Sequence, residues 1–346
     1  MKKTVANIII LVLSVLALDI YLSAVGAVSL SEYEFNPKTG IRFRNFDNQI
    51  IFNEGFAIKS YNSKELYNDD NSTKKSFRIA LVGDSYVKSD QVFERHHFGQ
   101  IMKNNLAIET PIEVLNYGYN GSDLKQMYIT QKVIVDPTNP DLILYFLSNQ
   151  DLQVNSFNDP LLPQISDSGN KLEIVCDFPE QISKSYQVTN TIKQHSSIVN
   201  LALNSIKQYK TNGILPALLG KFYYQPSLSE KDQLHKDSGH SKTPSTEVSH
   251  LMEKIIQDID ESKVIFVNRD KAKLSNDILA LIKANNIPLI DLSPALGDSI
   301  NNQSNYYYWK VSDQTGHWNK KAHQEIGTYL ASELNKILST TKPKLH

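Results

Sequence analysis

The sequence FRIALVGDSY at residues 77–86 joins a short apolar run to a Gly-Asp-Ser turn. The run Phe77–Val82 has the length and composition of a strand that is buried on both faces. In open α/β sheets, ligands bind beyond the carboxyl ends of such strands. The stretch therefore predicts an α/β fold and places Ser85 at a ligand-binding edge. Ser85 is either a nucleophile with its own backbone N–H as an oxyanion donor, or a simple helix cap.

The same alternation of strand and helix patterns continues along the chain. Further apolar runs predict four more strands, at 111–116, 141–147, 263–268 and 287–292. Amphipathic periodicity predicts helices at 92–107, 122–135, 273–285 and 319–338. Strands and helices that alternate at this spacing predict a parallel sheet with helices on both faces.

Composition excludes several classes of protein. With 346 residues, 40% hydrophobic and 21% charged, the chain is globular, with two domains or one domain with an insertion. A net charge of −1 argues against a nucleic-acid binder. The single cysteine, Cys176, excludes an intrachain disulfide and a cysteine-rich zinc site. We expect no metal and no cofactor.

The N-terminus predicts a membrane segment at residues 1–28. Lys2 and Lys3 precede an apolar stretch of about 21 residues, long enough to span a bilayer, which Asp19 interrupts. We expect an uncleaved signal anchor; the alternative is a signal peptide cleaved at the small residues Val25–Ala27. In both cases the rest of the chain is exported, to the periplasmic or extracellular side.

Pattern and composition divide the remainder into three parts. Residues 29–75 read as an irregular preface that ends in a polar linker at 68–75. The segments 76–151 and 256–340 form the α/β domain. The connection 152–255 is too long for a simple crossover and predicts a cap or lid insertion, which includes a polar segment at 227–247.

Polar residues follow the predicted strands in a way that suggests one shared site. Gly121 lies in the turn after the second strand, and Asn149 and Gln150 follow the third. His317 comes near the C-terminus, four residues after Asp313. A carboxylate can hold an imidazole so that its other nitrogen takes a proton from a serine. Each feature alone is also explained as a turn, a cap or a surface loop.

Taken together, these blocks resemble the SGNH (GDSL-type) hydrolase superfamily. The resemblance rests on Gly83-Asp84-Ser85, Asn116…Gly121, the Asn149/Asp151 segment and Asp313…His317. Two further stretches resemble membrane-anchored SGNH proteins associated with bacterial cell-surface polysaccharides, namely Asn53-Glu-Gly-Phe56 and His317-Trp-Asn319…His323. The resemblance implies a three-layer α/β/α, flavodoxin-like domain and ester hydrolysis or O-acyl transfer without a metal.

The resemblance also implies roles for individual residues. Ser85 is the expected nucleophile, His317 the general base and Asp313 its orienting partner. Gly121 and an amide of the third block are the expected oxyanion donors. This chain reads Ser148-Asn149-Gln150-Asp151 where the family has Gly-x-Asn-Asp, so the amide is Asn149 or Gln150.

The expected function is a membrane-tethered serine esterase or O-acyltransferase that acts on a cell-surface glycan, with O-acetyl as the expected acyl group. An acylated glycan or small ester is the expected substrate, and a membrane acyl donor a further expected partner. Asp84 is expected to fix the turn at the substrate site. Trp309 and Trp318 are expected to contact substrate, with the aromatic run Tyr306–Trp309 either stacking on a sugar or lying in the core. The alternatives are a non-catalytic glycan-binding or assembly protein, and a lipase or lysophospholipase.

Overall fold

The structure is a computed structural model. It describes residues 2–24, 33–43, 46–52, 54–61, 76–152, 160–167, 171–202, 249–297 and 306–340. The predicted linker at 68–75 and the predicted polar segment at 227–247 lie outside these residues.

A five-stranded sheet forms the centre of the α/β domain, and all of its pairings are parallel. Its strands are β5 (Phe77–Gly83), β6 (Ile112–Gly118), β7 (Leu142–Leu147), β10 (Val264–Asn268) and β11 (Leu289–Asp291). The spatial order is β6-β5-β7-β10-β11, which is the flavodoxin-like order. The chain passes from β5 to β6 on one side and then crosses to β7 on the other side, so the point where the strand order reverses lies between β5 and β7. The five strands predicted from the apolar runs are confirmed.

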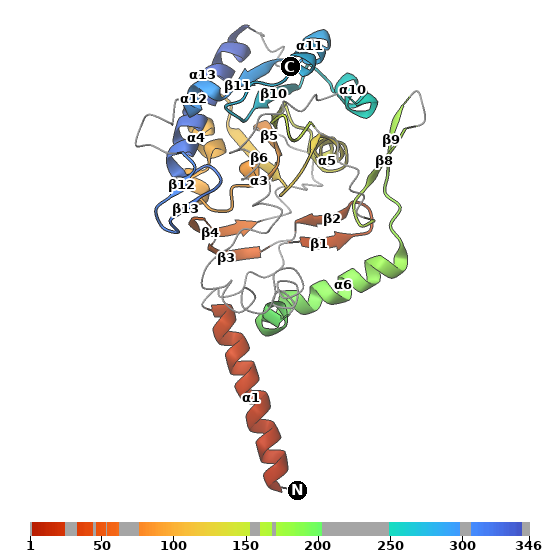
Figure 1. Cartoon of the computed structure of the whole chain (residues 1–346), viewed down its shortest axis with the longest axis vertical. Coiled ribbons are helices and arrows are strands. Elements are labelled where there is room, and N and C mark those ends of the chain that lie inside the picture. Colours follow the sequence, from red (N-terminus) through yellow and green to blue (C-terminus); the bar gives the residue numbers. More distant parts are fainter. Residues whose placement is uncertain are drawn as a thin grey trace, which may run out of the picture.

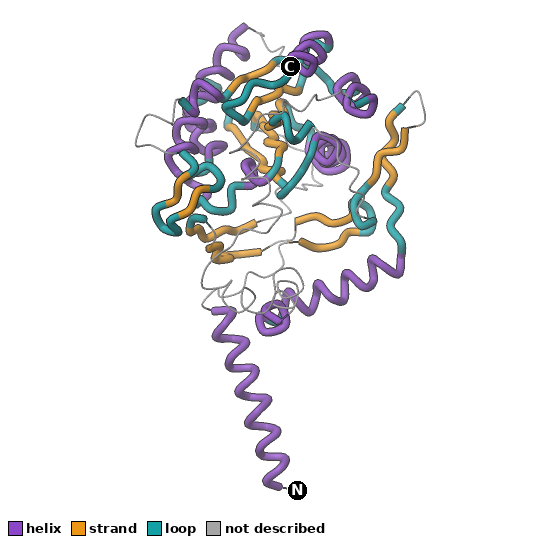
Figure 2. The backbone as a smooth tube through the Cα atoms, in the orientation of Figure 1, coloured by secondary structure: helices purple, strands orange, loops and turns teal. Residues whose placement is uncertain are grey.

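Helices cover both faces of the sheet (Figures 1 and 2). On one face lie α5 (Leu124–Thr130), α10 (His250–Gln257) and α11 (Asn276–Ala284). On the other lie α3 (Ser85–Lys88), α4 (Phe98–Asn105), α12 (Ser293–Leu296) and α13 (Lys320–Thr340). Alternate residues of β5 serve the two faces: Ala80 and Val82 pack into one core cluster, and Ile79 and Leu81 into the other. The expected three-layer arrangement is confirmed.

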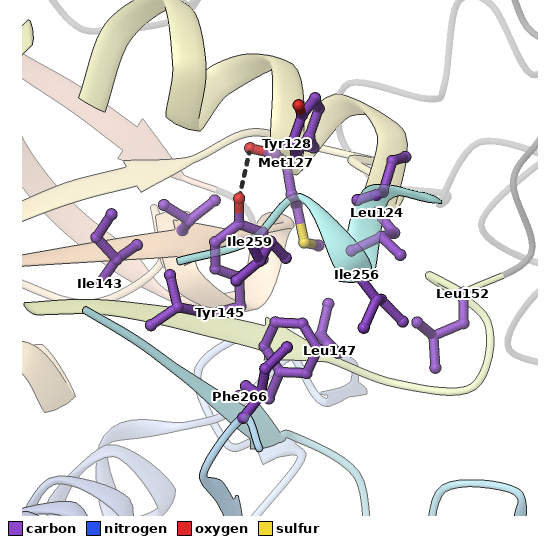
Figure 3. Packing of buried hydrophobic residues seen from close by; sticks show 14 of the residues in the cluster. Leu124, Met127, Tyr128, Ile143, Tyr145, Leu147, Leu152, Ile256, Ile259 and Phe266 are labelled. Carbon is purple, nitrogen blue, oxygen red and sulfur yellow. Dashed lines mark hydrogen bonds between the residues drawn. The ribbon is translucent and has the colours of Figure 1, made fainter. Parts of the chain in front are cut away.

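The core on the α5 face is tightly packed around aromatic side chains. Figure 3 shows Tyr145 and Phe266 of neighbouring strands beneath α5, with Tyr145 donating a hydrogen bond to the Met127 carbonyl. The helix continues past α5 as a π-helical turn, η3 (Gln131–Val135), followed by a 3-10 turn, η4 (Asp136–Thr138). A second 3-10 turn, η2 (Glu94–His96), precedes α4. The helical segment is therefore continuous from the start of α5 to the end of η3, residues 124–135.

The preface is not irregular, and that part of the prediction is wrong. It contains two antiparallel hairpins, β1 (Tyr33–Asn36) with β2 (Gly40–Phe43), and β3 (Phe46–Phe52) with β4 (Phe56–Tyr61). Strands of four to seven residues separated by turns contain too few alternations to stand out in the sequence. The hairpins lie between the sheet and the N-terminal helix (Figure 1).

The predicted cap contains a hairpin, β8 (Gln164–Asp167) with β9 (Leu172–Val175), and the helix α6 (Glu180–His195). Helix α10 begins at His250, and its Met252 and Ile255 are buried in the core cluster beside α5. The last residues of the predicted insertion, 250–255, therefore belong to the α/β domain.

The N-terminal helix α1 (Lys2–Ala24) projects from the rest of the molecule (Figure 1). Residues Lys2–Leu22 are long and apolar enough to cross a membrane and are not buried against the protein. Asp19, which interrupts the apolar run, accepts hydrogen bonds from the Ser196 hydroxyl at 3.1 Å and the Ile198 N–H at 2.7 Å. The helix has the properties of a membrane anchor or of a signal sequence.

Candidate active site

Ser85 lies at the carboxyl end of β5, where the strand turns into α3. Asp84 is the N-cap of α3, and its carboxylate accepts a hydrogen bond from the Tyr86 N–H at 2.9 Å. This cap makes Ser85 the first residue of the helix. Its hydroxyl oxygen lies 2.7 Å from Nε2 of His317, 232 residues away in the chain. The structure thus brings together the predicted nucleophile and the predicted base.

His317 follows a short hairpin formed by β12 (Tyr308–Trp309) and β13 (Gln314–Thr315). The Trp309 indole N–H donates to the His317 carbonyl oxygen at 3.0 Å. The imidazole packs against the ring of Tyr86, with 4.7 Å between ring centroids. These contacts fix the backbone and the ring of His317 in front of the serine.

Glu54 is the carboxylate partner of His317. Its Oε1 lies 2.9 Å from Nδ1 of the imidazole, and its Oε2 accepts from the His317 backbone N–H at 2.8 Å. The Asp313 carboxylate instead accepts from the Tyr308 hydroxyl at 2.6 Å. The prediction for Asp313 is therefore corrected, because Glu54 occupies the position at Nδ1.

Two features of the loop that carries His317 let the Glu54 carboxylate approach the imidazole. A Cβ atom on Gly316 would lie 2.1 Å from Oε1 of Glu54, so a larger residue would displace the carboxylate. The Ser312 hydroxyl donates to the Glu54 carbonyl at 2.6 Å, which ties the β3–β4 hairpin to the histidine loop. Sequence reasoning missed Glu54 because 263 residues separate it from His317. Its only signal was the Asn53–Phe56 resemblance, which carries no role.

The contacts at the two ring nitrogens determine which tautomer of His317 is favoured. A carboxylate on Nδ1 favours the tautomer with the proton on that nitrogen, and this leaves the Nε2 lone pair facing Ser85. That arrangement lets the imidazole take the hydroxyl proton as the oxygen attacks an electrophile.

The candidate oxyanion donors differ in their placement. Gly121 lies in an exposed turn after β6, at φ 72°. This turn is held beside the serine turn, because the Tyr119 N–H donates to the Gly83 carbonyl at 3.0 Å. The Asn149 amide donates to the Lys273 carbonyl at 2.9 Å and accepts from the Ser275 N–H at 3.0 Å.

Asn149 is thereby fixed to the loop that follows β10, and Gln150 is exposed. The structure therefore places Gly121 near the serine turn, whereas the Asn149 amide is bonded to Lys273 and Ser275.

The two tryptophans are buried, and the prediction that they contact substrate is wrong. Trp318 is 1% exposed and packs edge-on against Tyr86 and Phe98. Trp309 is 8% exposed. An indole without an exposed face cannot stack on a sugar ring. Both side chains support the site from beneath.

Asp84 belongs to a buried ion network. Its carboxylate lies 2.9 Å from the Arg269 guanidinium, which also lies 3.1 Å from the Asp151 carboxylate. The guanidinium stacks over the Tyr86 ring at 4.5 Å. Burial raises the pKa of Asp84 to about 6, against the opposing effect of Arg269. The network joins the serine turn to the ends of β7 and β10, so Asp84 acts as a turn-fixing residue.

A second buried group supports α3 from the α4 side. The Val87 carbonyl lies 2.8 Å from Nε2 of His97 and accepts from the Asn116 amide at 2.9 Å. Nδ1 of His97 accepts from the Gly99 N–H at 3.0 Å, so Nε2 carries the proton. Burial lowers the pKa of His97 to about 4, and the ring is neutral at pH 7.

Among the residues placed by the structure, no group of three or more His, Cys, Asp or Glu side chains is arranged to hold a metal ion.

Comparisons with known proteins gave matches among solved structures only. No family model and no curated protein matches the chain. A lipase/acylhydrolase from Enterococcus faecalis matches at 13% identity over 78% of this chain and 99% of its own, with a TM-score of 0.37. A member of the lipolytic G-D-S-L family from Veillonella parvula matches at 13% identity over 75% and 98%, with a TM-score of 0.32.

An inhibitor-bound aryl esterase from M. smegmatis matches at 10% identity over 76% of this chain and 100% of its own, with a TM-score of 0.34.

Proposed function

We propose that this protein is a membrane-tethered serine esterase or O-acyltransferase. The observation that carries the proposal is the continuous chain of contacts from Ser85 to His317 to Glu54. A nucleophile, a base and an orienting carboxylate in hydrogen-bond contact are the arrangement that activates serine for acyl transfer.

The reaction follows from these contacts. The Ser85 oxygen attacks the ester carbonyl carbon while its proton moves to Nε2 of His317, and the carbonyl π electrons move to oxygen. The tetrahedral intermediate collapses, the alcohol oxygen leaves and takes the proton from His317, and the acyl group stays on Ser85. Water or a sugar hydroxyl then attacks the acyl-enzyme, with His317 taking its proton and returning it to Ser85. Water yields a hydrolase and a sugar hydroxyl a transferase.

The negative charge of the intermediate needs hydrogen-bond donors. We assign this role to the backbone N–H groups of Ser85 and Gly121, because the turn that holds Gly121 is bonded to the end of β5. Asn149 would have to leave its partners in the 273–275 loop to serve as a third donor. Two backbone donors are enough for a functional oxyanion hole in the serine-protease template.

The apolar helix α1 supports attachment to a membrane, with Lys2 and Lys3 on the cytoplasmic side and the domain exported. An acylated cell-surface glycan, with a membrane acyl donor for the transferase reaction, is the substrate that the sequence resemblance favours. The resemblance by itself favours acetyl as the acyl group.

The test uses the full-length chain in lipid nanodiscs. We expect a fluorophosphonate probe to label the protein and an aryl ester to be hydrolysed, and both to be lost in Ser85→Ala. Ser339→Ala, the same change at an exposed serine far along α13, is the matched control and keeps both. A folded wild-type protein with neither labelling nor turnover contradicts the proposal.

That negative result would favour a non-catalytic binding protein. The observation in favour of this second function is the Asn149 amide, which is bonded to the 273–275 loop instead of standing at the serine.

A further inference from the structure

A cavity of about 390 Å³ lies beside the Gly121 turn. One wall is the α5–η3 segment, and the opposite side is closed by the β1–β2 hairpin, by residues 162–163 and by Tyr186 of α6. A volume of this size is within the range of small-molecule sites.

The polarity of the cavity changes along the α5–η3 wall. Along this wall Asp123 and Gln126 come first, then Ile129 and Thr130, then Val133 and Ile134. These positions span roughly 16 Å at the rise of an α-helix. The cavity is therefore elongated, with polar side chains near Gly121 and aliphatic side chains at the far end.

The polar end lies next to the serine turn. Tyr119 and Gly121 both line the cavity, and the Tyr119 N–H donates to the Gly83 carbonyl, two residues before Ser85. Neither Ser85 nor His317 lines it. The cavity thus begins at the proposed oxyanion donor and extends away from the reacting atoms.

The segments that form the roof of the cavity, namely the β1–β2 hairpin, residues 161–163 and α6, are joined to one another by hydrogen bonds. The Asn190 amide of α6 donates to the Tyr33 carbonyl at 2.6 Å, and the Ile41 N–H donates to the Leu161 carbonyl at 3.0 Å. These bonds hold the roof together, and Tyr33 stacks on Tyr119 of the α/β domain at 6.5 Å between ring centroids.

The lining selects the chemical class of the ligand. No Lys or Arg among the described residues lines the cavity, so nothing there pairs with a phosphate or other anion. A sugar needs hydrogen-bond partners around its ring, whereas the far end of the α5–η3 wall carries the aliphatic side chains of Val133 and Ile134. An ester with a hydrocarbon tail has the same gradient, with a polar carbonyl at one end and methylenes at the other.

We propose that this cavity binds the acyl chain of the substrate and that the acyl group is longer than acetyl. The inference rests on the proposed serine acyl transfer. With the carbonyl held at Gly121, the chain runs along α5 towards Val133 and Ile134. Each methylene that enters the aliphatic end is worth up to about fourfold in affinity for the transition state.

The test is a chain-length series on the full-length protein in nanodiscs of zwitterionic lipid. We expect kcat/KM for p-nitrophenyl acetate, butyrate, hexanoate and octanoate to rise by about two- to fourfold per added methylene. Val133→Phe fills the aliphatic end from a half-buried position and is expected to lower the octanoate-to-acetate ratio of kcat/KM at least tenfold.

Val188→Phe is the matched control, because Val188 is 63% exposed on α6 and does not line the cavity. It leaves the ratio unchanged. A wild type that prefers acetate, or an equal loss of both substrates in Val133→Phe, overturns the proposal.

A binding measurement separates this proposal from the proposed function. Equilibrium dialysis of radiolabelled octanamide, a neutral ligand with the same hydrocarbon chain, uses Ser85→Ala as the background, where no turnover occurs. Binding that is lost on adding Val133→Phe and kept on adding Val188→Phe supports the cavity even if the wild type shows no labelling by fluorophosphonate. Labelling without octanamide binding and without a chain-length preference overturns the cavity and leaves the serine chemistry standing.

Discussion

Glu54→Gln tests the residue that sequence analysis did not find. The amide has the shape of the carboxylate but no charge, and its NH₂ group donates a hydrogen bond where the carboxylate accepts one. Facing Nδ1 of His317, that NH₂ favours the tautomer with the proton on Nε2. The imidazole would then present an N–H to Ser85 and could not take the hydroxyl proton.

The size of the loss follows from the contacts. Glu54 accepts two hydrogen bonds from His317, at 2.9 Å to Nδ1 and 2.8 Å to the backbone N–H. The Nδ1 contact is the one that strengthens when the imidazole becomes charged in the transition state, and a hydrogen bond to a charged group is worth about 1.5–3 kcal/mol. With the tautomer change added, we expect a loss of about 3–5 kcal/mol, or roughly 10²–10⁴ in kcat.

The assay is kcat for an aryl ester, with the melting temperature as a measure of folding. Asp313→Asn is the matched change at the carboxylate that sequence analysis had placed beside His317. We expect it to alter kcat less than threefold, because its carboxylate bonds to the Tyr308 hydroxyl at an exposed position. Glu54→Asp, which keeps the charge on a shorter side chain, should recover part of the rate. If Asp313→Asn abolishes turnover while Glu54→Gln preserves it, the assignment of Glu54 is refuted.

Two further predictions concern buried charge. Arg269→Met leaves two buried carboxylates without their cation and should lower the free energy of unfolding by about 3–5 kcal/mol at pH 7. The melting temperature measures this loss, and Arg95→Met at an exposed site should leave it unchanged. Burial raises the pKa of Asp84 to about 6, so the deficit should shrink at pH 5, where that group is protonated. Burial lowers the pKa of His97 to about 4, below its ordinary 6.5; the unfolded chain therefore takes the proton first, and stability falls as the pH drops from about 6.5 to 4. Between pH 7 and 4.5, His97→Asn should reduce the fall in the free energy of unfolding, measured by urea unfolding, by about 2–3 kcal/mol. An unchanged dependence of that free energy on pH would contradict a buried, neutral His97.

The sequence was most informative where local pattern determines structure. All five strands of the sheet were predicted, since a strand covered on both faces reads as a continuous apolar run. Ser85 was predicted because its site lies at the end of such a run. Trp309 and Trp318 were misassigned because sequence pattern does not distinguish an aromatic residue that faces substrate from one that lies beneath the site.

Contacts between distant segments were beyond the reach of pattern. The carboxylate near His317 in sequence was chosen by proximity, yet Asp313 has φ 54° and directs its carboxylate to Tyr308. Arg269 follows β10 in the charged stretch Arg269-Asp270-Lys271, and only the fold shows that it bridges two carboxylates. In each case the partner lies on another element, so the pairing exists only after the chain has folded.

The preface hairpins change how the site should be regarded. Ser85 and His317 belong to the α/β domain, but their carboxylate partner comes from the turn between β3 and β4. That turn is held by hydrogen bonds from Ser312 and Gln91, and the adjoining β1–β2 hairpin forms part of the cavity roof. The same segment therefore orients the base and encloses the proposed acyl chain. Residues 33–61 are thus the first described residues after the apolar helix α1, and they complete both the charge arrangement of the site and its apolar cavity.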